Sequence, residues 1–238
     1  MFRKQLVKVA TVYNEALSNS HNRVFGEEFF PAMSRPEFDG LYRAFMEVRL
    51  QGDELAEGVR RIGAKDPEHG TIISDLAGHF PDAAYIQMIR DPRDVAVSTW
   101  SHMKRLDPAF AGPAGGFAEF ARQNVREWTI YVSHVRKAAA RPFQYLEVRY
   151  EDLHGDGAAT LARTLDFLGV DVGVDVVSRC LDEASFERAT GGRERGQADE
   201  TSFYRKGAIG DWRGHMAPAL GDELLAMTRG LAGELGYR

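Results

Sequence analysis

The chain has 238 residues, of which 44% are hydrophobic and 27% are charged, so it is long enough to bury a hydrophobic core. Its formal net charge of −5 argues against a broad nucleic-acid-binding surface but leaves room for a local basic pocket. No apolar run approaches the ~18 residues of a membrane-spanning helix. The first residues lack the long apolar region and the cleavage site of a secretory signal. We expect one domain over residues 1–238.

The chain contains a single cysteine, Cys180. It cannot form a disulfide within the chain, which fits a reducing compartment and a cytoplasmic location. Cys180 lies in "DVVSRCLDEAS", a stretch with helical periodicity. We expect it to be a small core residue rather than a nucleophile.

The spacing of apolar residues predicts three helices at the start of the chain, over residues 3–19, 38–62 and 71–80. "AAYIQMI" (83–89) is a short, apolar, β-favouring run that predicts a buried strand. A helix is expected next, from about Arg93 to Met103. A long amphipathic helix over residues 116–140 follows it.

The C-terminal half continues the alternation of strands and helices. "FQYLEVRY" (143–150) predicts a second strand, and helices are expected over 157–170, where Gly169 would end the helix, and over 221–237. Two glycine-rich or polar stretches are interpreted as loops, residues 107–116 and 190–201. Strands separated by helices predict an α/β domain with a central parallel sheet flanked by helices.

The segment "MIRDPRDVAVS" (88–98) joins a predicted strand to a predicted helix. In parallel sheets, ligands bind beyond the carboxyl ends of strands, where a helix N-terminus offers free N–H groups. Arg90 leaves the strand at that position, and Ser98 lies about two turns into the helix. A guanidinium and a hydroxyl so placed could share one anion, and phosphate suits both. Surface ion pairs at a helix start are the alternative interpretation.

A second segment, "SFYRKGAIGDWRGHM" (202–216), places two basic residues beside glycines. Gly207 and Gly210 would let the backbone approach a ligand closely, and successive N–H groups can form an anion-binding nest. Arg205 and Lys206 beside such a nest again indicate phosphate. A merely flexible basic loop is the alternative.

In this order, the two segments resemble those of sulfotransferases that use 3′-phosphoadenosine 5′-phosphosulfate (PAPS). "IRDPRDVAVS" looks like the family's 3′-phosphate motif, and "RKGAIGDW" looks like its C-terminal cofactor loop. Three further segments match, "VRYEDL" (148–153), "LDFLGV" (165–170) and "ELGY" (234–237). The resemblance implies a P-loop NTPase-like sulfotransferase fold, here shortened at its N-terminus. A P-loop-like kinase is less well supported, because no G-x-x-x-x-G-K-[ST] motif is present.

The resemblance also implies which residues bind the cofactor. Those implied for the 3′-phosphate are Arg90, Ser98, Arg205, Lys206 and Gly207. Tyr150 would lie near the adenine, and Phe186 would stack on the base, with packing in the core as the alternative for Phe186. Trp212 is expected to anchor the loop.

"GAKDPEHG" (63–70) resembles the "KDP" segment of the tyrosylprotein and related bacterial branch. There, Lys65 would stabilise the charge that develops as the phosphate leaves, whereas a solvated surface lysine is the alternative. "HNRVFGEEFF" (21–30) resembles the segment that carries the general base, which by position is Glu28, with Glu27 close behind. His69 is the competing base, although it is displaced from the position that the cytosolic branch uses.

The family also has a strand, a loop such as P-R-S-G-T-T, and a helix near its N-terminus, and that loop wraps the 5′-phosphosulfate. The matching region here is "LVKVATVYNEAL" (6–17), where Lys8 and Thr11 fall near loop positions. It has no glycine, and the β-branched Val9 and Val12 suit a tight phosphate cradle poorly. We interpret this region as the family's first helix with a shortened or foreign start.

The sequence therefore predicts transfer of a sulfuryl group from PAPS to an acceptor hydroxyl on a small molecule, glycan or peptide. The product would be 3′-phosphoadenosine 5′-phosphate (PAP), and the chemistry requires no metal. The alternative is a shortened or non-catalytic module that binds PAP or PAPS without transfer. No segment carries a signature of the acceptor.

Overall fold

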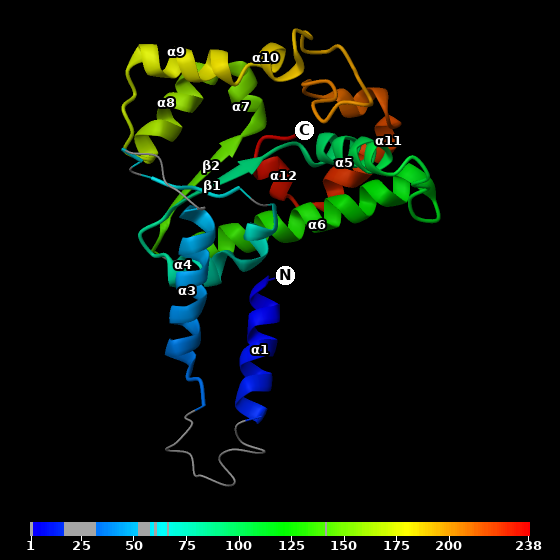
Figure 1. Ribbon diagram of the computed structural model, residues 1–238. Coiled ribbons are helices and arrows are strands. Elements are labelled where there is room, and N and C mark those ends of the chain that lie inside the picture. The colour runs from blue at the N-terminus through cyan, green and yellow to red at the C-terminus, as the bar shows by residue number, and fades with distance from the viewer. Residues whose placement is uncertain (1, 17–31, 52–57, 60, 66, 141) are drawn as a thin grey trace. The chain divides into compact units, whose positions relative to one another are not determined.

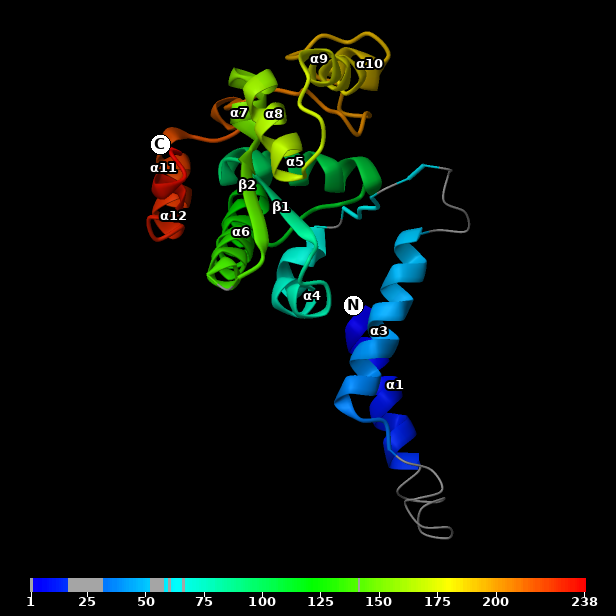
Figure 2. The ribbon, with the colours of Figure 1, turned by 90° about the vertical axis from the view of Figure 1, so that its left-hand side faces the viewer.

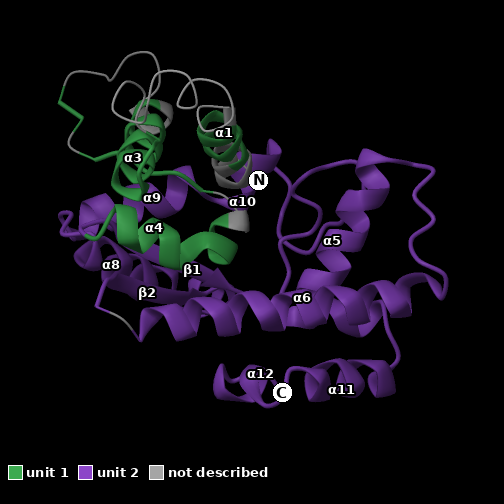
Figure 3. Ribbon diagram, turned by 90° about the horizontal axis from the view of Figure 1, so that it is seen from below, with its two compact units in different colours: residues 1–81 green, residues 82–238 purple. Residues whose placement is uncertain are grey.

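The computed structural model describes residues 2–16, 32–51, 58–59, 61–65, 67–140 and 142–238 (Figure 1). They belong to two compact units, residues 1–81 and 82–238 (Figure 3). Each unit is described by itself below. The expectation that the chain is one domain stays a prediction.

The first unit is helical. Its elements are α1 (Phe2–Ala16), α3 (Arg35–Gln51), the 3₁₀ helix η2 (Pro67–Ile72) and α4 (Ile73–His79). The Glu37 carboxylate accepts hydrogen bonds of 2.7 Å from both the backbone N–H and the hydroxyl of Ser34, which caps the start of α3. The ring centroids of Tyr42 on α3 and His79 on α4 lie 4.8 Å apart, so these two helices are in contact.

The second unit contains the sheet. Its elements are β1 (Ala84–Ile89), α5 (Pro92–Leu106), α6 (Gly116–Ala139), β2 (Gln144–Arg149), α7 (Tyr150–Gly155), α8 (Gly157–Phe167), α9 (Val174–Glu183), α10 (Phe186–Thr190), the 3₁₀ helix η3 (Asp211–Gly214), α11 (Pro218–Met227) and α12 (Leu231–Glu234). The two strands pair in parallel, from Ala84 opposite Gln144 to Ile89 opposite Arg149 (Figure 2). The chain crosses between them through α5 and α6, as a parallel pair requires.

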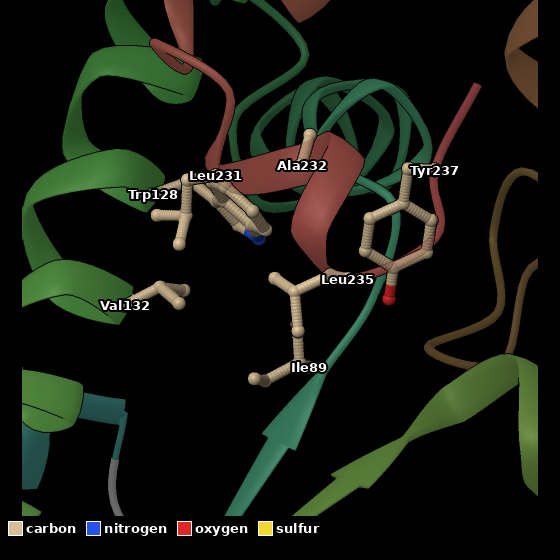
Figure 4. Close-up of a cluster of buried hydrophobic side chains, with 7 residues drawn as sticks. All are labelled: Ile89, Trp128, Val132, Leu231, Ala232, Leu235 and Tyr237. Atoms are coloured by element: carbon tan, nitrogen blue, oxygen red, sulfur yellow. The ribbon is translucent and has the colours of Figure 1, made fainter.

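Helix α6 contributes side chains to two clusters of buried residues in the second unit. One cluster joins the end of β1 to α6 and the C-terminal residues, and consists of Ile89, Trp128, Val132, Leu231, Ala232, Leu235 and Tyr237 (Figure 4). The other joins α5, α6, η3 and α11, and consists of Ala96, Val97, Ala121, Val125, Trp212, Met216 and Leu224. The end of β1 belongs to the first cluster and α5 to the second, so the turn at residues 90–91 joins two packed segments.

Most predicted elements are confirmed, including both strands, the helix that follows the first strand and the long helix over 116–139. The predicted helix over 38–62 is too long, because α3 ends at Gln51 and residues 58, 59, 61 and 62 are not helical. The first strand is less buried than expected, since Ile86 and Met88 on its surface are 40% and 54% exposed. No helix among the described residues has the length and apolar character needed to cross a membrane.

The single helix predicted over 221–237 is also wrong, because the chain breaks between α11 and α12. Arg229 and Gly230 have φ angles of 55° and 90°, which interrupt the helix. The buried Thr228 hydroxyl donates to the carbonyl of Leu225 and accepts from the N–H of Ala232, so it closes one helix and caps the next. Cys180 is a further correction, because it is exposed on α9 rather than in the core.

A substitution in the second cluster tests this packing. Leu224→Ala removes a fully buried side chain, and we expect it to lower the free energy of unfolding by about 2–5 kcal/mol. Leu106→Ala makes the same change on α5 where the side chain is 61% exposed, and should alter stability by less than about 0.5 kcal/mol. Urea denaturation measures both, and equal losses would contradict the assignment of Leu224 to the core.

Candidate functional site

The turn between β1 and α5 has a fixed backbone. Asp91 caps α5 by accepting a 2.9 Å hydrogen bond from the N–H of Arg93, and Pro92 is the first helical residue. The carbonyl of Arg90 accepts from the indole N–H of Trp128 at 3.1 Å. The N–H of Asp91 donates to the Glu151 carboxylate at 2.9 Å. The Arg90 side chain therefore leaves from a well-anchored position at the carboxyl end of the strand.

Glu151 also binds the C-terminal segment. Its second carboxylate oxygen accepts a 2.9 Å hydrogen bond from the Tyr237 hydroxyl. Two of the short segments noted in the sequence, "VRYEDL" and "ELGY", thus meet at the backbone that presents Arg90. Both segments therefore help to fix the position of the end of β1.

The Arg90 guanidinium is 22% exposed and lies over an aromatic ring. Its Cζ is 4.4 Å from the centroid of Tyr150, and its Nη2 donates to the carbonyl of Ala208 at 2.8 Å. The same nitrogen lies 3.6 Å from the Asp94 carboxylate. Its Nε is buried and has no hydrogen-bond partner among the residues that the structure describes. Arg90 therefore keeps donor capacity for a ligand.

Asp94 joins α5 to the basic loop, a name used here for residues 205–212. Its carboxylate is fully buried and accepts hydrogen bonds from the backbone N–H groups of Gly210, at 2.7 Å, and Trp212, at 2.9 Å. Gly210 has a φ of 71°, which favours glycine. Asp94 and Arg90, which donates to Ala208, thus both join the segment 90–98 to the basic loop.

Arg93 serves a structural purpose, in a buried ion pair rather than the surface ion pair that the alternative interpretation of the sequence expected. Its guanidinium is buried and makes hydrogen bonds of 3.0 and 2.7 Å to the Asp91 carboxylate. Its Cζ lies 3.9 Å from the ring centroid of Trp212. Trp212 is itself buried beneath the basic loop, so the expectation that it anchors this loop is confirmed.

Asp211 gathers the cations of the basic loop. Its carboxylate is 4% exposed and accepts hydrogen bonds from Arg205 and from the Lys206 Nζ, with the His215 Nε2 3.2 Å away. Burial works to raise the pKa of Asp211, but the hydrogen bonds from Arg205 and Lys206 outweigh it and hold the pKa at about 2. The carboxylate is therefore ionised at neutral pH and fixes both cations.

Ser98 and Arg205 line one cavity in the second unit. Ser98 is exposed on α5, about two turns after the helix start, and the cavity has a volume of about 300 Å³. Its other lining residues include His102, Arg105, Ser202 and Phe203. The structure thus places a hydroxyl and a guanidinium from segments far apart in the sequence on the same concave surface.

The two residues predicted to contact the base, Tyr150 and Phe186, have different neighbours. Tyr150 stacks between Arg90 and His154, whose ring centroid is 4.5 Å from that of Tyr150. Burial, then the charges of Arg195 and Arg90, lower the pKa of His154 to about 4.

Phe186 is 8% exposed and packs directly against the basic loop. Gly207 has a φ of 63°, and a Cβ there would lie 2.6 Å from the Phe186 ring. This packing matches the core alternative for Phe186, and stacking on a base stays a prediction.

The predicted catalytic residues belong to the first unit or lie outside the described residues. Glu28 and Glu27 lie outside the described residues. Lys65 is exposed in an irregular segment, and His69 is half-buried in η2. Lys8 and Thr11 lie in α1, in agreement with the interpretation of that region as a helix.

Three residues of the site were missed at the level of sequence. The sequence did indicate Asp94, because it follows Arg90 by four residues and lies in the first turn of the predicted helix, where it could reach a neighbouring loop. Asp211 directly follows Gly210, close in sequence to Arg205 and Lys206, and its opposite charge could have suggested an ion pair with them. No sequence pattern in the glycine-rich stretch 190–201 indicated Arg193, which hydrogen-bonds to the basic loop.

Residues 74–236 match the family model described as "Sulfotransferase domain". The match covers more than half of the chain and includes all seven residues predicted to bind the cofactor. Glu28, Lys65 and His69 precede it.

Several curated proteins and solved structures are similar to the chain. Sulfotransferase 2A6 of Mus musculus is 28% identical over 149 residues, which are 58% of this chain and 52% of that protein. Cytosolic sulfotransferase 1 of Arabidopsis thaliana is 23% identical over 163 residues, 58% of this chain and 47% of that protein. The chain thus spans about half the length of these relatives.

Two solved structures share the fold at a TM-score of 0.52 and 22% identity each. One is mouse sulfotransferase SULT7A1 complexed with PAP, matched over 65% of this chain and 60% of that one. The other is retinol dehydratase in complex with androsterone and inactive cofactor PAP, matched over 91% of this chain and 63% of that one. They confirm the predicted α/β fold.

The low pKa of Asp211 predicts an acid dependence of stability. The folded-state pKa of about 2 lies below the ordinary value of 3.8, so the ionised group stabilises the fold above about pH 4. That stabilisation is lost as the pH falls through the folded pKa. Between pH 4 and pH 2, we expect the free energy of unfolding of the unsubstituted chain to fall by about 2 kcal/mol more than that of Asp211→Asn.

Urea denaturation at a series of pH values measures this difference. Asp166→Asn, which changes an exposed carboxylate on α8, is the matched control and should keep the steep acid dependence. The same steepness in Asp211→Asn would show that Arg205 and Lys206 do not hold this carboxylate ionised.

Proposed function

The chain belongs to the sulfotransferase family, and from this premise we propose that it binds PAPS and transfers the sulfuryl group to an acceptor hydroxyl. One observation carries the proposal. The Asp94 carboxylate binds the backbone of the basic loop, so Arg90 at the end of β1 and the cations at 205–206 belong to one site. Cations converging beyond the carboxyl end of a parallel strand suit a nucleotide phosphate.

The 3′-phosphate end of PAPS has candidate ligands in the second unit. Arg90 has a buried Nε without a partner among the described residues, which supports an anionic ligand there. Ser98 and Arg205 would supply a hydroxyl and a second guanidinium from the wall of one cavity. Lys206 and Gly207 would add a cation and a closely approaching backbone. Tyr150, which already stacks on Arg90, and Phe186 would contact the adenine.

The transfer itself is assigned to residues of the first 81 positions on the strength of the family resemblance. The acceptor oxygen forms a bond to sulfur, and the bond between sulfur and the bridging phosphate oxygen breaks, which releases PAP with that electron pair. Glu28 takes the acceptor's proton, with Glu27 and His69 as competing bases. Lys65 stabilises the charge that develops on the bridging oxygen. The "KDP" segment places the chain with the tyrosylprotein-like and bacterial branch.

The acceptor is proposed to be a small molecule, glycan or peptide with a free hydroxyl, and the location to be cytoplasmic. No step of this chemistry needs a metal, because Lys65 and the site cations supply the positive charge. The 5′-phosphosulfate loop of the family is not apparent at residues 6–17, which contain no glycine and whose residues 6–16 are helical in α1.

That last observation favours a second candidate function. Residues 82–238 could hold the 3′-phosphoadenosine end without transfer, and the chain would then act as a PAP-binding module. The residues proposed for that end all lie within the matched region, 74–236. Binding of PAP without transfer to any acceptor would identify this second function.

A charge reversal at Arg90 tests nucleotide binding. We expect Arg90→Glu to weaken PAP binding at least about 100-fold, because a guanidinium is lost and a carboxylate is placed against the anion. Isothermal titration measures the affinity, and circular dichroism checks that the fold is kept. Arg179→Glu on the exposed side of α9 makes the same charge change and should bind as the unsubstituted chain does. Unchanged affinity in Arg90→Glu would refute the placement of the site.

Two substitutions test the transfer step. With labelled PAPS and a panel of hydroxyl-bearing acceptors, we expect Lys65→Ala and Glu28→Gln each to lower kcat at least about 100-fold. The Kd for PAP should stay within about threefold, because neither residue is assigned to the 3′-phosphate. His69→Asn tests the competing base. A loss of kcat as large as that of Glu28→Gln would assign the role of general base to His69 instead.

A further inference from the structure

We infer that Arg193 is a positioning residue that holds Arg205 and Lys206 in place for the 3′-phosphate, an inference that rests on the proposed function. Arg193 lies in the glycine-rich stretch 190–201, between α10 and the basic loop. Its side chain is 22% exposed, and its guanidinium is turned to the protein rather than to solvent.

The guanidinium of Arg193 binds the chain on both sides of residue 203. Its Nη1 donates to the carbonyls of Gln197, at 2.9 Å, and Arg205, at 3.0 Å. Its Nη2 donates to the Ser202 hydroxyl at 2.9 Å and to the carbonyl of Tyr204 at 2.5 Å. One planar group thus fixes four points of the segment that leads into the basic pair, which its fork of donors suits.

The backbone of the basic pair is held by the same stretch. The N–H of Gly196 donates to the carbonyl of Lys206 at 2.8 Å, and the N–H of Asp199 donates to the carbonyl of Arg205 at 2.9 Å. The Arg205 carbonyl therefore accepts from both Asp199 and Arg193. Without Arg193, two backbone hydrogen bonds would remain to position this pair.

Besides these hydrogen bonds, Arg193 contacts an aromatic ring. The Arg193 Cζ lies 5.3 Å from the ring centroid of Phe186, and the same ring packs against Gly207. Arg193 and Gly207 thus share one buried ring, which ties the glycine that follows the basic pair to the same guanidinium. A displacement of the Arg193 side chain would therefore change the contacts of residues 204, 205 and 207 together.

Arg193 is not itself a phosphate ligand in this arrangement. Both of its Nη atoms are directed to carbonyl or hydroxyl oxygens of the loop, and its Nε lies 3.9 Å from the Asp199 carboxylate. Arg188 offers a contrast within the same region, since it is half-exposed and pairs with the exposed carboxylates of Asp182 and Glu183. Arg188 is therefore a matched control that carries the same charge, because its guanidinium binds Asp182 and Glu183 rather than the basic loop.

The experiment compares two ligands in Arg193→Lys, Arg188→Lys and the unsubstituted chain. PAP carries the 3′-phosphate and adenosine 5′-phosphate does not, so the ratio of their affinities reports recognition of that phosphate. We expect the ratio to fall at least about fivefold in Arg193→Lys, because lysine keeps the charge and loses the fork. In Arg188→Lys the ratio should equal that of the unsubstituted chain. General destabilisation would weaken both ligands equally and leave the ratio unchanged.

Hydrogen exchange of the free protein supplies a second measurement. Amides of residues 196–206 should exchange faster in Arg193→Lys, while those of β1 and β2 keep their rates. If the unsubstituted chain binds PAP and Arg193→Lys keeps both the affinity ratio and the exchange rates, the positioning assignment is overturned. If the unsubstituted chain does not bind PAP, the proposed function fails, and the assignment of Arg193 to a phosphate site fails with it.

Discussion

The arrangement of the second unit depends on one buried carboxylate, that of Asp94. A buried charge costs several kcal/mol unless polar groups satisfy it. Here two backbone N–H groups, of Gly210 and Trp212, point at the carboxylate, and the Arg90 guanidinium lies 3.6 Å away. Because backbone donors leave little freedom of placement, the loop that contains them must pass over the start of α5. The geometry of the basic loop follows from this requirement.

Buried carboxylates also pair the cations of this region. Arg90, Arg205 and Lys206 would repel one another if each faced only the others. Asp94 faces the first, and Asp211 binds the other two from beneath with a pKa held at about 2. The cations are thus oriented by the protein itself, and the proposed ligand would need little reorganisation of them. Preorganised charge of this kind is what makes an anion site strong.

The sequence was informative where local chemistry decides the structure. An apolar run followed by "RDPRD" predicts a strand, a cap and a helix start, and the structure has each of them between Ala84 and Leu106. Contacts that span long stretches of the chain were beyond such reasoning. Asp94 and Gly210 are 116 positions apart, and no local pattern pairs them. The break at Arg229 was missed for a different reason, since the apolar spacing continues through "LLAMTRGLAGEL" although Arg229 and Gly230 leave the helical conformation there.

The proposed function assigns the 3′-phosphate and the transfer step to different residues, and this has a chemical consequence. Arg90 and the basic loop are held by hydrogen bonds within residues 82–238, whereas the residues proposed for the transfer step precede residue 82. In the proposed assignment, affinity for the nucleotide and the rate of sulfuryl transfer would therefore be separate properties, carried by different groups. A 3′-phosphate is the part of PAPS that does not react, and binding energy gained there raises the rate only if it orients the reacting sulfuryl group. A chain built in this way would keep the first property after changes that remove the second, and Asp94 is the residue through which the first would be lost.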